Sequence, residues 1–194
     1  MVIKSPCWYW ESEIPVDICD KIIDSVDMNQ NKRGSLQNKE NPKGKREVNM
    51  QFIDINWIDH IVLGYIRSAN FQNFNYNLSD YNKERTQFTC YSQGDFYHIH
   101  CDYDDTIGDP NHTRKLSLSL QLSDEKDYEG GDLLIYPRPD KIILAPKAKG
   151  SVIVFDSRLF HEVTKVTKGS RYSLVKWYHG DNPFMRFDKI LFFV

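Results

Sequence analysis

The sequence predicts an α+β fold that is mainly β and antiparallel. Three observations carry this prediction. Apolar residues recur at helical intervals in the first third of the chain, they alternate with polar residues from residue 87 onward, and glycines and prolines separate the alternating segments. Helices followed by many short strands are typical of a domain built on an antiparallel sandwich or barrel.

Two helices are expected before the strands. Residues 15–26 open with a proline, which is favoured in the first helical turn, and their apolar side chains are helically spaced. Residues 56–71 carry a second apolar stripe of the same period. Residues 28–47 lie between them and are polar, so we expect a long loop, either a functional lid or a floppy insertion.

Seven short strands are expected in the rest of the chain, because short runs rich in β-branched and aromatic residues alternate there between turn signals. They are residues 87–91, 97–101, 115–122, 132–136, 141–144, 151–155 and 171–177. We find no internal repeat and no linker that divides the chain. The 194 residues, 40% of them apolar, therefore suit a single domain over residues 1–194.

The composition excludes several classes of function. A formal net charge of -2 predicts no general attraction to nucleic acid or to acidic membranes. No two of the four cysteines are separated by two to four residues, so neither a zinc knuckle nor a disulfide framework is expected. No secretory signal and no run of ~20 apolar residues is visible. We therefore expect a soluble, cytoplasmic protein without nucleic-acid or membrane partners, and the sequence carries no signal for its oligomeric state.

His100 and Asp102 form the first part of a candidate metal site. They are two residues apart, so on a strand both side chains project from the same face. His161 is the best candidate for a third ligand, because it follows residues 151–160, which would end near the mouth of a barrel. Two histidines and one carboxylate leave three positions open around iron(II), and those positions can take a bidentate 2-oxo acid and dioxygen.

Arg171 is a candidate for binding the far carboxylate of such an acid. It begins the last predicted strand, where Ser173 and Trp177 share its parity and would face the same way. A guanidinium binds a carboxylate bidentately, so an arginine and a hydroxyl at one end of a strand make a suitable clamp.

Each of these residues alone has a simpler interpretation. The His-x-Asp spacing arises often by chance, and a lone histidine or arginine is more often a surface or core residue. Tyr97 and Trp177 are equally well explained as core aromatics. The ordered set is more specific than its parts, because each residue falls at the expected end of a strand.

The chain resembles the prolyl 4-hydroxylase-like branch of the iron(II)- and 2-oxoglutarate-dependent dioxygenases. Four segments carry the resemblance, and their motifs together span residues 87–178. Residues 87–102 have the spacing of that family's first iron motif, and residues 114–133 resemble its arginine-led strand with a Gly-Gly-acidic-Leu turn. Residues 146–166 and 169–177 resemble the segments with the last metal ligand and the basic co-substrate residue.

This resemblance implies a double-stranded β-helix (jelly-roll) core with N-terminal supporting helices. It implies Fe(II), 2-oxoglutarate and O2 as reactants, with bound ascorbate as the reductant. His100, Asp102 and His161 are then the metal ligands, and Arg171 pairs with the far carboxylate of 2-oxoglutarate.

The resemblance also assigns the surrounding residues. It places Tyr91 beside the co-substrate, and Trp177 and Tyr97 on the substrate side. Gln121 stands where some relatives have a second tyrosine, and Ser173 is expected to compensate.

The function expected from these features is hydroxylation of prolyl residues in a peptide or protein. Two alternatives stay open. One is a dioxygenase of the same superfamily that acts on a nucleobase or a small molecule, although the paired-arginine motif typical of the nucleic-acid enzymes is absent. The other is a non-catalytic jelly-roll binding module, against which the intact triad and Arg171 count.

Overall fold

The computed structural model describes residues 5–34, 46–79, 84–103 and 113–180. Its N-terminal part holds β1 (Cys7–Trp10), α1 (Val16–Asp24), η1 (Met28–Gln30), β2 (Lys32–Arg33), β3 (Arg46–Glu47), β4 (Asn49–Ile53), α2 (Asn56–Ala69) and a π-helical turn η2 (Asn70–Phe74). The remainder holds β5 (Thr86–Ser92), β6 (Phe96–His100), β7 (Thr113–Gln121), η3 (Glu125–Asp127), β8 (Tyr128–Gly130), β9 (Leu133–Arg138), β10 (Lys141–Leu144), β11 (Val152–Asp156), β12 (Phe160–Val163) and β13 (Val166–Gly180). In these described ranges no helix is long and apolar enough to cross a membrane.

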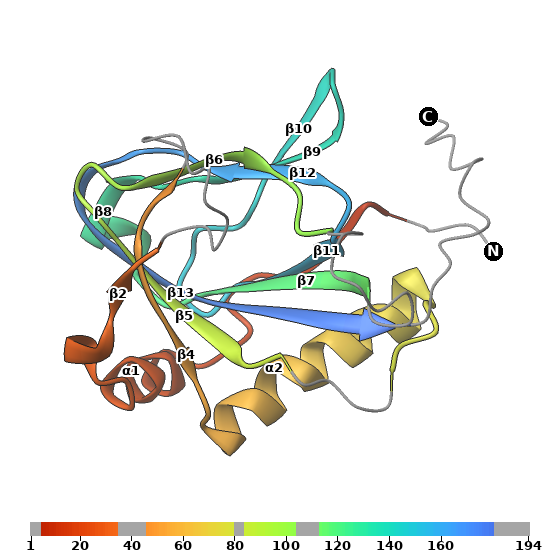
Figure 1. Ribbon diagram of the computed structural model, residues 1–194, viewed down its shortest axis with the longest axis horizontal. Helices are drawn as coiled ribbons and strands as arrows, with labels where there is room; N and C mark the ends of the chain where they lie inside the picture. Colours follow the sequence, from red (N-terminus) through yellow and green to blue (C-terminus); the bar gives the residue numbers. More distant parts are fainter. Residues whose placement is uncertain (1–4, 35–45, 80–83, 104–112, 181–194) are drawn as a thin grey trace.

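Two antiparallel sheets face each other and enclose the centre of the molecule (Figure 1). The larger sheet has the order β1-β11-β7-β13-β5-β4-β2, with β8 paired to β13, and the smaller has the order β10-β9-β12-β6-β3. The expected α+β fold, mainly β and antiparallel, is therefore confirmed.

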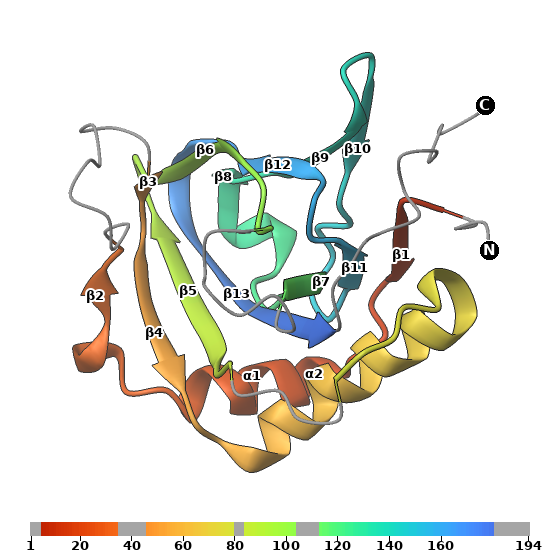
Figure 2. The same ribbon diagram turned by 45° about the vertical axis from the view of Figure 1, so that its right-hand side comes forward.

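The two helices cover the outer face of the larger sheet, on the side away from the smaller sheet (Figure 2). Strand alternation explains why they pack there. Leu116, Leu118 and Leu120 of β7 share one face, and they join the buried Ile58 and Val62 of α2 in one core cluster. Full burial of each such side chain contributes about 1.5–3 kcal/mol, so this layer anchors the sheet.

The other face of the larger sheet is far more polar. Ser117 and Gln121 of β7 alternate with the leucines, and Ser173 of β13 lies on the same inner side. A smaller apolar cluster that includes Ile135 and Phe155 closes the remaining space between the sheets. Polar groups are thus concentrated in the interior between the two sheets.

Most predicted elements are present, with their ends shifted by a few residues. Both helices form, and each of the seven predicted strands overlaps an observed one. Residues 28–47 differ from the expected loop at both ends, because β2 pairs with β4 and β3 pairs with β6. The middle of that segment, 35–45, lies outside the described residues, so its role as a lid stays a prediction. The assignment of residues 1–194 to one domain also stays a prediction.

Candidate active site

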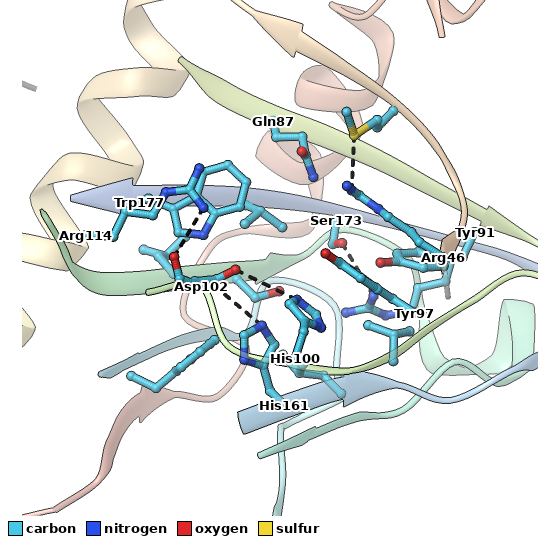
Figure 3. A pocket seen from close by; sticks show the side chains of 18 of the residues that line it. Arg46, Gln87, Tyr91, Tyr97, His100, Asp102, Arg114, His161, Ser173 and Trp177 are labelled. Atoms are coloured by element: carbon cyan, nitrogen blue, oxygen red, sulfur yellow. Dashed lines mark hydrogen bonds and ion pairs between the residues drawn. The ribbon is translucent and has the colours of Figure 1, made fainter. Parts of the chain in front are cut away.

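His100 and His161 meet because their strands are paired. Strand β12 lies antiparallel to β6, and the register sets His161 directly opposite His100. Their imidazole centroids are 4.2 Å apart. Asp102 follows β6, and its carboxylate completes a group in which one ligand atom from each residue lies within 4.8 Å of the others (Figure 3).

Both histidines are oriented by the backbone of their own segments. Nδ1 of His100 lies 2.8 Å from the carbonyl oxygen of His98, and Nδ1 of His161 lies 3.0 Å from that of Leu159. A carbonyl oxygen only accepts, so Nδ1 carries the proton and a neutral imidazole keeps its lone pair on Nε2. Each ring therefore presents a metal-binding nitrogen to the cavity.

Asp102 is held from two sides. Its backbone N–H donates to the carbonyl oxygen of Ser157 at 2.9 Å, and the Ser117 hydroxyl donates to its Oδ2 at 2.7 Å. The carboxylate oxygens then lie 3.8 Å from His100 Nε2 and 3.5 Å from His161 Nε2. These distances are too long for hydrogen bonds. Lone pairs therefore face lone pairs, an arrangement that a cation between them would stabilise.

The protonation states favour the same interpretation. Burial and, to a smaller extent, the neighbouring His161 lower the pKa of His100 to about 4, so His100 is neutral at neutral pH. Burial by itself would raise the pKa of Asp102, but the two histidines, Arg114 and the Ser117 hydrogen bond together hold it below its ordinary value. Two imidazoles and one carboxylate fit a first-row divalent ion such as iron(II).

Arg171 is buried on β13 without an acidic partner among the described residues. Its side chain is 4% exposed, and its Nε donates to Gln121 Oε1 at 3.0 Å. Its Nη1 lies 3.4 Å from Ser173 Oγ, a longer contact. Gln121 is held in turn by the Tyr128 hydroxyl, 3.1 Å from its Nε2. Only neutral groups contact this charge, so the guanidinium is available to an anionic ligand.

A single cavity of about 430 Å³ joins these groups. Its lining includes the eight residues that the sequence assigns to the metal, co-substrate or substrate: Tyr91, Tyr97, His100, Asp102, His161, Arg171, Ser173 and Trp177. Figure 3 shows Trp177 on one side of Asp102, and Tyr91 and Tyr97 on the other. Strand β13 crosses the whole cavity, which explains why Arg171 and Trp177 both reach it although they are six residues apart.

Comparison with known proteins shows what the second half of the chain resembles. A family model described as the 2OG-Fe(II) oxygenase superfamily matches residues 86–179, the segment that contains every residue of the triad. Over that segment, just under half of its length, the chain is similar to the 2OG-Fe(II) oxygenase superfamily. A PKHD-type hydroxylase of Idiomarina loihiensis is 32% identical over 93 residues, which are 48% of this chain and 41% of that protein. The chain thus matches less than half the length of this curated relative.

Solved structures extend the likeness to nearly the whole fold. A prolyl-4-hydroxylase of Pseudomonas putida matches with a TM-score of 0.69 and 21% identity, over 92% of this chain and 95% of that one. A prolyl hydroxylase of Trichoplax adhaerens, in complex with a hypoxia inducible factor peptide fragment, matches with a TM-score of 0.70 and 18% identity, over 91% and 84% of the two chains. The double-stranded β-helix core expected from the sequence is confirmed.

The structure places one predicted ligand differently from the position that the sequence predicts. His161 was expected just beyond a strand of residues 151–160. In the structure β11 ends at Asp156, the chain turns, and His161 lies within β12. Ser157 is in this turn, and its carbonyl oxygen accepts the N–H of Asp102. The turn therefore positions two of the three predicted ligands.

Three residues of the site, two that line the cavity and one behind Asp102, receive no role from the sequence. Arg114 at the start of β7 stacks over Trp177, with its guanidinium carbon 4.0 Å from the ring centroid, and pairs with Glu84. Ser117 orients Asp102. Arg46 enters from β3, inside the segment expected to be a loop. Strand parity identifies Ser117 once β7 is known, but no local pattern identifies Arg46.

Proposed function

We propose that this chain is an iron(II)- and 2-oxoglutarate-dependent hydroxylase that acts on prolyl residues of a peptide or protein. One observation carries the proposal. The two imidazoles and the carboxylate converge in the same cavity as Arg171, a buried cation with no acidic partner among the described residues. A metal ion bound by the three ligands and a 2-oxo acid bound by Arg171 would therefore lie next to each other.

His100, Asp102 and His161 would hold the iron in this proposal. Bound iron supplies activation of O2, by which 2-oxoglutarate, O2 and a C–H bond become succinate, CO2 and a C–OH group, one oxygen atom going to succinate and the other to the hydroxyl. The hydrogen bonds from His100 and His161 to backbone carbonyls keep both Nε2 lone pairs aimed at the ion. Ser117 keeps the carboxylate of Asp102 turned toward it.

Arg171 would bind the far carboxylate of 2-oxoglutarate. Because Gln121 accepts from Nε, the guanidinium plane is set before the ligand arrives. Ser173 Oγ, which lies 2.6 Å from Thr89 Oγ1, adds a hydroxyl beside it. Tyr91 is buried next to this guanidinium: the distance from Arg171 Cζ to the centroid of the Tyr91 ring is 5.8 Å. Tyr91 would therefore border the co-substrate.

The substrate would enter past Trp177 and Tyr97. The indole is held flat between its strand and the Arg114 guanidinium, and a flat aromatic face suits a proline ring. The Tyr97 ring stacks on His100 at a centroid separation of 3.6 Å, which brings this side of the cavity close to the iron ligands. Ascorbate as a bound reductant and a cytoplasmic location belong to the proposal as well.

A peptide screen tests the proposal. The protein is incubated with a proline-containing peptide library, Fe(II), 2-oxoglutarate and ascorbate, and mass spectrometry detects peptides that gain one oxygen. Hydroxylated prolyl peptides, formed with equal amounts of succinate, would support the proposal. Oxygen gain only on nucleobases or free small molecules would refute the prolyl substrate, and no succinate with any substrate would refute the dioxygenase.

Trp177→Ala tests the substrate side of the cavity separately. We expect a larger loss of peptide hydroxylation than of peptide-independent succinate formation, because the indole contacts the substrate and not the co-substrate. Removing one aromatic contact should cost about 10-fold in peptide affinity. Equal loss of both activities would show that Trp177 serves only to keep the fold.

A further inference from the structure

Arg46 lies inside the cavity on the side of Tyr97. Strand β3 pairs with β6 in a register that sets Arg46 opposite Tyr97. The guanidinium carbon lies 4.5 Å from the Tyr97 ring centroid, and the other face of Tyr97 stacks on His100. Figure 3 shows Arg46 next to Tyr97, and Tyr97 next to His100. Arg46 is therefore one aromatic ring away from the candidate metal ligands.

The charge of Arg46 has no acidic partner among the described residues. Its Nη2 contacts the Met50 sulfur at 3.0 Å, which is a weak acceptor, and its Nε is buried without a hydrogen-bond partner in those ranges. The next residue, Glu47, is an acid, but its carboxylate is bound to Arg33 at 2.8 Å. A desolvated guanidinium donor facing a cavity is unfavourable until an acceptor arrives.

The other charges of the cavity are accounted for. Arg114 pairs with Glu84, and Asp102 belongs to the metal site. In the proposed function the two carboxylates of 2-oxoglutarate bind the metal and Arg171. Among the described lining residues, this leaves Arg46 as the cation without an anion.

Arg46 and Arg171 lie on different strands around Tyr91. Burial raises the pKa of Tyr91, and the positive charges of Arg46 and Arg171 partly offset that effect, so both cations act on this ring. Arg171 has Gln121 and Ser173 around it, whereas Arg46 has an aromatic ring and a thioether. The two arginines therefore form separate anion sites.

We propose that Arg46 binds a carboxylate side chain of the peptide substrate, so that the enzyme prefers a glutamate or aspartate near the hydroxylated residue. This inference rests on the proposed function for the peptide itself. A carboxylate fits a single guanidinium with free donors, whereas a doubly charged phosphate is usually met by several basic groups. The Tyr97 ring beneath the guanidinium would keep it flat for bidentate contact.

The first arm of the test measures binding, not turnover. Short peptides with blocked termini carry a central proline and one glutamate scanned through the flanking positions, and a second set carries glutamine at the same positions. Fluorescence anisotropy gives their affinities for the metal-free protein at low salt. We expect at least one position at which glutamate binds about 10- to 100-fold more tightly than glutamine, the range for a charge-assisted hydrogen bond.

The second arm exchanges the charges. Arg46→Gln should bring the glutamate-to-glutamine ratio close to one, and Arg46→Glu should prefer a peptide with lysine at the selected position. Arg46→Lys should keep part of the glutamate preference, which guards against loss of fold in the other variants. Arg138→Gln is the matched control, because Arg138 lies on β9, outside the cavity lining, and should leave the ratio unchanged.

The outcomes separate the two proposals. If the glutamate peptides bind more tightly but no peptide gains oxygen, the proposed function is refuted and the preference for an acidic side chain is supported. Hydroxylation with equal use of glutamate and glutamine peptides would overturn the role of Arg46 and leave the hydroxylase standing. A wild-type ratio in Arg46→Gln, or a raised 2-oxoglutarate requirement with an intact ratio, would also overturn it.

Discussion

Strand β13 buries two cations on opposite faces of the larger sheet. Lys176 points toward the helices, is 1% exposed, and donates to Asp59 Oδ1 at 2.5 Å and to the Glu84 carbonyl oxygen at 2.6 Å. Arg171 points into the cavity, is 4% exposed, and contacts only the neutral Gln121 and Ser173 among the described side chains. The same strand therefore carries one compensated and one uncompensated charge.

The different surroundings of Lys176 and Arg171 indicate that the first supports the fold and the second is available to a ligand. On the helix face, an ion pair across α2 and β13 offsets the cost of burying Lys176. On the cavity face, the fold leaves Arg171 and the facing lone pairs of the candidate metal site without such compensation among the described residues. A protein tolerates such groups where a ligand completes them. Substitutions on the cavity face should hence change activity more than stability, and substitutions on the helix face should do the reverse.

The largest expected effect is that of His161→Ala on the cavity side. We expect loss of iron binding and a fall in turnover of more than about 100-fold, beyond what is seen when only a residue that orients a metal ligand is changed. Metal analysis and succinate formation measure this, with circular dichroism to check the fold. His60→Ala, an exposed histidine on α2, is the control. Full iron binding by His161→Ala would remove His161 from the metal site.

Arg171→Met comes next. The KM for 2-oxoglutarate should rise about 10- to 100-fold, because a charge-assisted contact is lost. The free energy of unfolding should change by less than about 1 kcal/mol, since no buried acid is left without its partner. Steady-state kinetics and urea denaturation give the two numbers. An unchanged KM would mean that the co-substrate binds elsewhere.

Lys176→Met is the matched change on the helix face. It removes the Lys176 donor to the Glu84 carbonyl oxygen and the charged partner of Asp59, which keeps the hydrogen bond from the Thr86 hydroxyl. Because Asp59 is also partly exposed, we expect a loss of about 1–3 kcal/mol in the free energy of unfolding. The KM for 2-oxoglutarate should stay at the wild-type value. If Lys176→Met raised the KM while Arg171→Met lowered the stability, the contrast between the two faces of the sheet would be wrong.

The smallest effects concern two glycines. Gly131 has φ +61°, and a Cβ there would lie 3.2 Å from Arg171 Cδ and 3.0 Å from Val166 Cγ2. Gly131→Ala should lower the free energy of unfolding by about 1–2 kcal/mol because of the left-handed backbone. Gly64 lies in α2 with open space around it, so Gly64→Ala should raise stability by about 0.5–1 kcal/mol. Thermal melts compare the two variants. If both changed the melting temperature in the same direction, the different roles given to Gly131 and Gly64 would be wrong.

The features of the fold and the site that could be predicted are those that depend on the spacing of residues within one strand or helix. The alternation in β5, β7 and β13 is visible in the sequence, and it places Tyr91, Gln121 and Arg171 on the inner face of the sheet. The sequence does not predict β1, at one edge of the larger sheet, or β4, next to its other edge. They are short, and their place depends on pairing with β11 and β5, which no local pattern encodes.

The sequence by itself determined which residues are candidates for carrying the chemistry. His100 and Asp102 are two apart, and Arg171 and Ser173 share a strand parity, so their common faces follow from backbone geometry alone. Only the tertiary structure decided that His161 stands opposite His100, because this depends on the register between β12 and β6. It also decided that Arg46 reaches the cavity, since β3 is a two-residue strand that exists only through its pairing with β6.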